Sequence, residues 1–344
     1  MGADPSAVVG AVRPALERSD VPGAVVVVVR DGRIVASIAH GIDPATGEPI
    51  RVDELFQVGS ISKAVSAMAV ASLVDQGVID WDDDVRDHLT SYDLLDPYDE
   101  PVTFARLLSH TAGATVEGFP GYPPGSAVPS AIDVLAGRGN SPEVVIAGEP
   151  GSRYAYSGGG YTVVQQALVD LTGREFAALV HELVLEPTGA VSATFAQPLP
   201  VARLGEATAG SIGGDAVDPF VYPEQAAAGL WASGLDLAAV VIGFQHALAG
   251  EASWLGADNA AYLVESDAAD FTGFVGHGLF VERERDPAWF WHRGRNTGYS
   301  AEMIGSVDGR HGLVVVTNAL DAQVMIRAVV AAVADVEAWD GYPI

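Results

Sequence analysis

The sequence predicts a mixed α/β (α+β) fold, in which the two ends of the chain form one antiparallel sheet with flanking helices and an inserted helical subdomain. Three observations support this prediction. Strand-like runs near the N-terminus meet at Asp31-Gly32, and strand-like runs near the C-terminus meet at Asp308-Gly309. Both dipeptides are strong hairpin signals. Between these ends, residues 78–225 carry turn-rich connections and helical segments.

The elements of the first half follow in order. Residues 5–19 have the periodicity of a helix, and residues 23–41 read as two strands joined by a tight turn. Residues 59–77 predict a helix that is buried on all faces, because its middle is apolar on nearly every side. Residues 114–152 are rich in Gly, Pro and Ser, which predicts a long surface excursion.

The second half returns to strands. A glycine turn at 158–160 precedes two predicted helices, and an apolar helix follows residues 222–230. Strands are expected within 276–319, with a closing helix over 322–339. We therefore expect a discontinuous sheet domain, residues 1–77 and 226–344, and a mainly helical subdomain, residues 78–225.

Composition excludes several classes of function. A net charge of −27 argues against nucleic acid and anionic membrane surfaces as partners. The chain has no cysteine, and therefore no disulfide, thiolate metal site or cysteine nucleophile. It lacks a membrane-spanning apolar run and a signal-peptide pattern at its start, so we expect a cytoplasmic location.

Lys63 is the only lysine; the other 17 basic residues are arginines. It lies three residues after Ser60, so both side chains share one face of the predicted buried helix. Burial lowers the pKa of a lysine, and a neutral amine can accept the proton of a serine hydroxyl. Ser60 would then be a nucleophile and Lys63 its base. The alternative is that Ser60 only caps the helix while Lys63 lies in solvent.

Four further patches have unremarkable interpretations when each is taken alone: helix ends, a glycine turn, or a structural histidine. They are L-S-H-T-A-G at 108–113, Y-S-G at 156–158, Y-P-E-Q-A-A-A-G-L-W at 222–231, and H-R-G followed by T-G-Y at 292–299. In this order, and together with S-I-S-K at 60–63, they resemble the penicillin-recognising serine hydrolases. This family includes class C β-lactamases, D-amino-acid peptidases and family VIII carboxylesterases. The likeness extends from the first hairpin to the last helix.

The resemblance implies a β-lactamase/transpeptidase-like fold, with the active site in the cleft between the sheet domain and the helical subdomain. It implies no metal and no organic cofactor. Ser60 would be the nucleophile, Lys63 its proton acceptor and Tyr156 a proton shuttle whose phenolate needs a nearby cation, for which Lys63 is the expected partner. The backbone N–H groups of Ser60 and Arg295 would form the oxyanion hole.

Positions 158 and 292–293 depart from the β-lactamase pattern. Gly158 replaces an Asn that contacts the acyl side chain, and His292-Arg293 replaces the K-T pair that binds a carboxylate. His292 is expected to be catalytic, as in the H-x-G variant of the family, and Gly294 leaves room for substrate. Arg293 or Arg295 is expected either to attract a substrate carboxylate or to serve only surface charge. An esterase or peptidase is therefore favoured over an efficient β-lactamase.

The expected substrate is a small-molecule or short-peptide ester or amide, cleaved through a Ser60 acyl-enzyme. Two alternatives stay open: an acyl transferase or peptide cyclase that uses the same acyl-enzyme, and a non-catalytic peptide-binding protein on the same fold. No G-x-S-x-G or H-E-x-x-H pattern occurs, which disfavours an α/β-hydrolase and a zinc hydrolase. The oligomeric state is not predicted.

Overall fold

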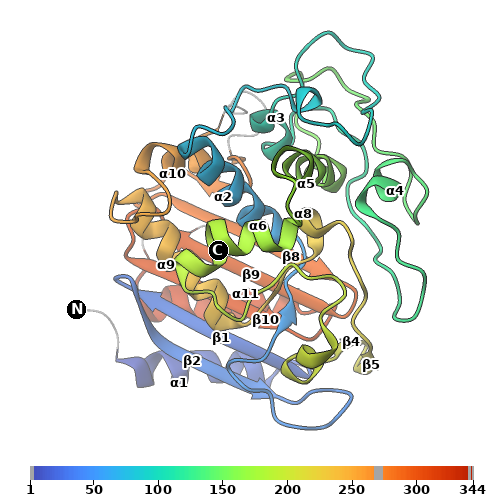
Figure 1. Ribbon diagram of the computed structural model, residues 1–344. Helices are drawn as coiled ribbons and strands as arrows, with labels where there is room; N and C mark the ends of the chain where they lie inside the picture. Colours follow the sequence, from blue (N-terminus) through green and yellow to red (C-terminus); the bar gives the residue numbers. More distant parts are fainter. Residues whose placement is uncertain (1–3, 267–273, 340–341, 343–344) are drawn as a thin grey trace.

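A six-stranded antiparallel sheet forms the centre of the protein, with strand order β2-β1-β10-β9-β8-β7 (Figure 1). The computed structural model describes residues 4–266, 274–339 and 342. The strands are β1 (Gly23–Arg30), β2 (Arg33–Gly41), β7 (Phe280–Glu282), β8 (Trp289–Asn296), β9 (Tyr299–Ser306) and β10 (His311–Thr317). The sheet contains strands from both ends of the chain, as predicted, and β1 pairs directly with β10.

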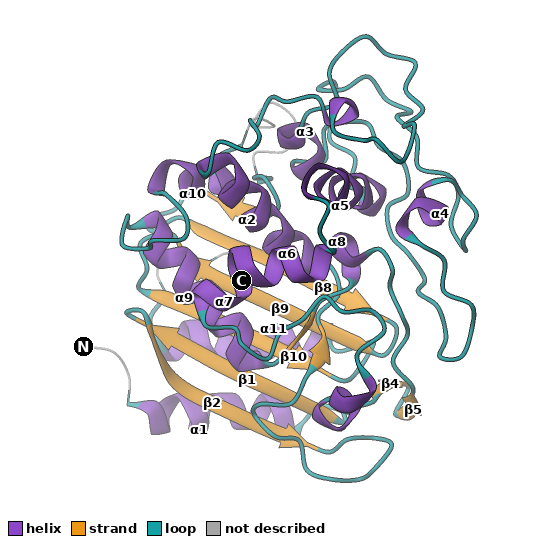
Figure 2. Cartoon of the chain, in the orientation of Figure 1, coloured by secondary structure: helices purple, strands orange, loops and turns teal. Residues whose placement is uncertain are grey.

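Helices cover both faces of the sheet (Figure 2). In β1, Val26 and Val28 face α1 (Pro5–Glu17) and α11 (Gln323–Val336), while Val25 and Val27 belong to the core formed with α2 (Ile61–Asp75) and α9 (Gly234–Leu248). Side chains alternate across a strand, so a strand covered on both faces is apolar throughout. This explains the uninterrupted valine run of β1.

The remaining helices lie mainly between α2 and α9 in the chain. They are α3 (Phe104–Leu108), α4 (Ala131–Leu135), α5 (Gly158–Thr172), α6 (Phe176–Val180), α7 (Glu186–Thr188), α8 (Gln225–Ala228) and α10 (Ala257–Val264). Helices α3, α4 and α5 lie together at the end of the molecule away from α1 (Figure 1). Residues of α6 share one hydrophobic core with α2 and α9. The division into 1–77 with 226–344 and 78–225 therefore stays a prediction.

Two small sheets were not predicted from the sequence. Strands β3 (Phe56–Gln57) and β6 (Trp231–Ala232) pair with each other, and β4 (Gly210–Ile212) and β5 (Asp215–Val217) form a hairpin. The region 78–225 is therefore not wholly helical. The strand expected within 276–284 is also shorter than its apolar pattern suggested, because only Phe280–Glu282 pairs with β8.

Candidate active site

The N-terminus of α2 places Ser60 beside the sheet. Gly59 precedes it with a φ of +51°, and a Cβ on Gly59 would lie 2.4 Å from the backbone N of Arg295 in β8. Glycine is the residue that tolerates both this backbone conformation and this approach. Ser60 stands at the N-cap position of α2, yet its side chain makes no capping hydrogen bond. The Ser60 hydroxyl is therefore available for other contacts.

Lys63 is buried, with 2% of its surface exposed, so it does not lie in solvent. Its Nζ lies 3.0 Å from Ser60 Oγ and donates to the carbonyl of Ala227 in α8 at 2.8 Å. Burial lowers the pKa of Lys63 to about 7. A substantial fraction of the amine is then neutral at physiological pH, and a neutral Nζ has a lone pair that can accept a hydrogen bond from the Ser60 hydroxyl across the same 3.0 Å contact. These contacts argue against the interpretation of Ser60 as a simple helix cap.

Tyr156 completes a triangle with Ser60 and Lys63. Its hydroxyl shares a hydrogen bond with the Ser60 side chain, and Lys63 Nζ lies 5.0 Å from the centre of its ring. Burial raises the pKa of Tyr156 to about 12, which outweighs the lowering by the Ser60 hydrogen bond. This arrangement does not support the expectation of a phenolate stabilised by Lys63, because burial favours the neutral phenol near pH 7.

His110 supports Tyr156 from the helical side. The two ring centres lie 4.3 Å apart, and His110 Nδ1 accepts a hydrogen bond from the backbone N–H of Ser157 at 3.0 Å. Burial, followed by the charges of Lys63 and His292, holds the pKa of His110 well below its usual range. Sequence reasoning used L-S-H-T-A-G only as a family signature and assigned no role to its histidine.

Strand β8 forms the opposite side of the site. A Cβ on Gly294 would lie 1.7 Å from the Val58 carbonyl and 3.1 Å from Ser60 N, so β8 lies directly against the start of α2. Asn296 Nδ2 donates to Gln57 Oε1 at 3.0 Å and to the Ala228 carbonyl at 2.9 Å, which ties β8 to α8. The backbone N–H groups of Ser60 and Arg295 thus come from two segments in direct contact.

His292 is a neutral base in this setting. Its Nδ1 donates to the Arg293 carbonyl at 2.7 Å, which leaves Nε2 with a lone pair. Burial, and secondarily the Lys63 charge, lower the pKa of His292 to about 3. His292 and His110 line the same small cavity with Leu108 and Phe280.

The side chains of Arg293 and Arg295 point away from Ser60. Alternation along β8 places His292 and Gly294 on the α2 face and the two arginines on the α11 face. Arg293 Nε donates to Glu302 Oε1 at 3.0 Å, and Arg295 Nη2 donates to Asp321 Oδ1 at 3.1 Å. The expectation that Arg293 contacts substrate is therefore not supported by its position, whereas Arg295 can contribute only its backbone N–H.

Phe119 occupies the space beside Gly158. A Cβ on Gly158 would lie 3.1 Å from Phe119 Cε2 and 3.1 Å from the Glu117 carbonyl. Gly158 therefore opens no free space; it allows the 115–119 loop to lie on the first turn of α5. Sequence reasoning missed Phe119, because a loop residue remote from every motif carries no positional signal.

Glu224 was also missed, although it lies within the Y-P-E-Q-A-A-A-G-L-W stretch. It is fully buried, and neither carboxylate oxygen has a hydrogen-bond partner in the described part of the chain. Burial raises its pKa to about 7. Glu224 lies three residues before Ala227, whose carbonyl holds Lys63. Only the structure identifies Glu224 as a candidate, because the sequence does not show that its carboxyl is buried without a hydrogen-bond partner.

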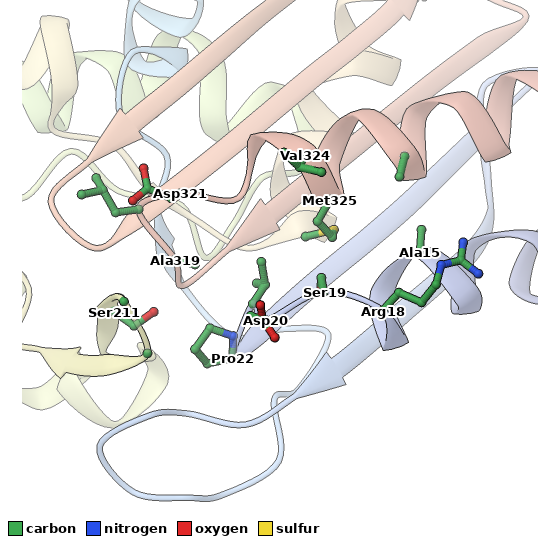
Figure 3. Close-up of a pocket in the computed structure, with 15 residues that line it drawn as sticks. Ala15, Arg18, Ser19, Asp20, Pro22, Ser211, Ala319, Asp321, Val324 and Met325 are labelled. Atoms are coloured by element: carbon green, nitrogen blue, oxygen red, sulfur yellow. The ribbon is translucent and has the colours of Figure 1, made fainter.

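A larger surface cavity lies elsewhere. It has a volume of about 680 Å³ and lies between the end of α1, the β4–β5 hairpin and the start of α11 (Figure 3). It contains none of the predicted site residues. Within residues 4–266, 274–339 and 342, no three His, Asp or Glu side chains gather as metal ligands, and no helix is long and apolar enough to cross a membrane.

The beta-lactamase family profile matches residues 8–335, so the chain belongs to the beta-lactamase family. This confirms the resemblance inferred from the ordered motifs. The chain is 31% identical over 189 residues to esterase EstB of Burkholderia gladioli, a match covering 51% of this chain and 47% of the esterase. It is 29% identical over 173 residues to penicillin-binding protein 4 of Amycolatopsis lactamdurans, covering 49% of this chain and 43% of that protein. The chain thus spans about half the length of these curated relatives.

A solved structure of SurE shares the fold. It superposes with a TM-score of 0.81 at 24% identity, covering 99% of this chain and 78% of SurE. Solved structures of a penicillin-binding protein homologue from Pyrococcus abyssi and of a beta-lactamase/D-alanine carboxypeptidase from Yersinia pestis superpose with TM-scores of 0.76 and 0.75, at 20% and 17% identity. With the family match, these superpositions confirm the predicted β-lactamase/transpeptidase-like fold.

Gly294→Ala is expected to destabilise the protein by about 3 kcal/mol, because the new Cβ would overlap the Val58 backbone. Urea unfolding measures the change. The control is Gly10→Ala, where a Cβ meets nothing within 4 Å and the helix gains propensity. Equal stability of the two variants would contradict the close approach of β8 to α2.

Glu224→Gln tests the buried carboxyl. In wild type, the pKa of Glu224 in the folded protein is about 7, above the ordinary value of 4.5. Glu224 therefore takes up a proton on folding at pH values between 4.5 and 7. The loss of unfolding free energy caused by the buried Glu224 carboxyl therefore grows as the pH rises through this window. It reaches its full value of about 3 kcal/mol above pH 7. Unfolding free energies at pH 5 and pH 8 should show the variant gaining this amount relative to wild type at pH 8. A difference independent of pH would show that Glu224 is already charged in the folded protein at pH 5.

Proposed function

We propose that the protein is a serine hydrolase that cleaves an ester or amide through an acyl-enzyme on Ser60. One observation carries the proposal: Ser60 Oγ lies 3.0 Å from a buried lysine amine whose pKa is about 7. A base of this pKa has both a large neutral fraction and a useful affinity for the proton at neutral pH. A non-catalytic binding protein has no chemical need for this arrangement.

Acylation would begin when Lys63 Nζ takes the Ser60 proton as Oγ attacks the substrate carbonyl carbon. The oxygen that becomes negative would be bound by the backbone N–H groups of Ser60 and Arg295. Collapse of the tetrahedral intermediate breaks the bond to the leaving group, which departs with a proton. The product is a Ser60 ester and a free alcohol or amine.

Tyr156 is the proposed donor of that proton. As a neutral phenol bonded to the Ser60 hydroxyl, it can protonate the leaving group and recover a proton from the Lys63 ammonium. In deacylation, the direction of proton transfer is reversed. Water gives a proton to the Tyr156–Lys63 pair as it attacks the carbonyl carbon of the acyl-enzyme ester. The pair then returns a proton to Ser60 Oγ as the carboxylic acid leaves. Water thus supplies one proton and one hydroxyl overall.

His292 is proposed as a neutral hydrogen-bond acceptor beside this relay. Its Nδ1 is committed to the Arg293 carbonyl, so Nε2 is the only ring nitrogen that can accept a proton. With a pKa of about 3 it remains uncharged through the neutral range, and it adds no second positive charge near Lys63. Its catalytic role would therefore be to orient a polar hydrogen.

Efficient β-lactam hydrolysis is not part of the proposal. Both arginines of β8 are paired on the opposite face, so neither guanidinium faces Ser60 to hold a β-lactam carboxylate. The relatives include a protein named as an esterase and one named as a penicillin-binding protein. We propose small esters or short-peptide amides as substrates, with the same acyl-enzyme for either class.

The first test is the intact mass of the protein after incubation with a panel of p-nitrophenyl esters and with a penicillin. We expect a Ser60-dependent acyl adduct or p-nitrophenol release with at least one ester, and little or slow reaction with penicillin. Ser60→Ala should abolish both while leaving the circular dichroism spectrum unchanged. Wild-type rates in Ser60→Ala would refute the assignment.

The second test is the pH dependence of kcat/KM on p-nitrophenyl acetate. The base must be neutral, so activity should rise with pH through about 7 and fall roughly tenfold per unit below it. Glu224 has a similar pKa, which makes Glu224→Gln the decisive control. The inflection should persist in Glu224→Gln. Its disappearance there would assign the titration to Glu224 and remove the support for Lys63 as base.

A further inference from the structure

Tyr156 is held differently from the other proposed catalytic side chains. Ser60 and Lys63 lie at the start of α2, and His292 lies in β8. Tyr156 instead lies in residues 153–157, an irregular segment that precedes α5. Repeating backbone hydrogen bonds fix a residue of a helix or strand, and an irregular segment lacks them. Contacts from another part of the chain must therefore hold the phenol against Ser60.

His110 supplies these contacts on both sides of Tyr156. Ala155 N–H donates to the His110 carbonyl at 2.8 Å, and Ser157 N–H donates to His110 Nδ1 at 3.0 Å. The rings of His110 and Tyr156 also pack together, with their centres 4.3 Å apart and their planes inclined by 37°. One residue thus fixes the backbone before and after the phenol and contacts the phenol ring itself.

The His110 ring is itself held in place. It is buried, its centre lies 5.3 Å from that of Tyr161 in α5, and it meets Tyr154 edge-on at 5.9 Å. The Tyr161 hydroxyl donates to the Leu108 carbonyl at 2.8 Å, which ties α5 to the turn that carries His110. Because Nδ1 accepts a hydrogen bond, the neutral ring carries its proton on Nε2. Both the orientation and the tautomer of His110 are therefore determined.

The backbone of His110 is in the left-handed region, with a φ of +60°. Residues other than glycine adopt this conformation at a cost in free energy, and Asn, Asp and His adopt it most often. A turn that only redirected the chain would be served by glycine, which has no such cost. An imidazole kept in this conformation, with its carbonyl and Nδ1 both bonded to residues 155–157, indicates that the ring is needed for its contacts.

We propose that His110 is a positioning residue, which holds the Tyr156 hydroxyl where it can transfer a proton to the leaving group. The inference rests on the proposed Ser60 acyl-enzyme with Tyr156 as the proton donor. His110 acts only through Tyr156, because its carbonyl and Nδ1 are occupied by Ala155 and Ser157. Loss of the imidazole should therefore slow the cleavage of an ester more when its leaving group needs a proton more.

The test compares p-nitrophenyl, phenyl and trifluoroethyl acetate, whose leaving groups are increasingly basic. All three form the same acetyl-enzyme, so differences in kcat/KM report acylation. His110→Gly tolerates the left-handed backbone but removes the acceptor and the ring. We expect it to lower kcat/KM for trifluoroethyl acetate about tenfold more than for p-nitrophenyl acetate. His110→Asn also tolerates this backbone and keeps an acceptor at the δ position, so it should recover most of the selective loss.

Asp31→Gly is the matched control. Asp31 also has a positive φ, of +49°, in the turn between β1 and β2, and its replacement should affect the three esters equally. In a Tyr156→Phe background, His110→Gly should cause no further selective loss, because the hydroxyl that it positions is absent. Should His110→Gly fail to fold, His110→Phe keeps a ring and removes only the acceptor, and the same selective loss is expected there.

An equal loss for all three esters in the His110 variant, a selective loss that persists in Tyr156→Phe, or a selective loss in Asp31→Gly would each overturn the proposal. The proposed function is judged separately, by hydrolysis of p-nitrophenyl acetate in wild type and its absence in Ser60→Ala. If Tyr156→Phe is selective and His110→Gly is not, only the positioning role falls. If Tyr156→Phe slows the three esters equally, the donor role of Tyr156 falls, and this inference falls with it.

Discussion

The burial of one lysine amine determines how the rest of the site is arranged. A charged ammonium in an apolar helix would lose most of its hydration, so the protein lowers the pKa of Lys63 instead of surrounding it with carboxylates. The Ala227 carbonyl satisfies one N–H, and Ser60 takes the remaining contact. The apolar character of α2, which looks like simple core packing, is therefore what lowers the pKa of Lys63 into the range that the proposed base requires.

The same constraint extends to the other ionisable groups. His110 and His292 are both held neutral, first by burial and then by the Lys63 charge. Tyr156 stays a phenol because burial raises its pKa more than the hydrogen bond with Ser60 lowers it, and the charge of Glu117 acts in the same direction as burial. Among Lys63, His110, His292 and Tyr156, only Lys63 therefore has a pKa near 7.

Much of this site could be predicted from the sequence, because helix and strand periodicity determine which side chains lie on the same face. A spacing of three residues on a helix brings Ser60 and Lys63 together. Alternation along a strand likewise places Arg293 and His292 on opposite faces of β8. The Gly213-Gly214 pair was likewise a readable hairpin signal for β4–β5. By contrast, the Glu117 carbonyl accepts a hydrogen bond from Gly158 in α5 and the Phe119 ring packs at Gly158, and no local pattern encodes these contacts. The pKa of Tyr156 also depends on burial by distant segments.

The division between rigid and variable parts follows from these contacts. Ser60 and Lys63 are fixed by a buried helix, and position 294 by a backbone approach that leaves no room for a side chain. The 115–122 loop instead bridges two walls: it is bonded to the first turn of α5, and the Pro120 carbonyl accepts from Thr297 Oγ1 at 3.4 Å beside β8. Helix α2 and strand β8 therefore hold Ser60, Lys63 and Gly294 through buried packing and backbone contact, whereas hydrogen bonds at both ends hold the loop beside them.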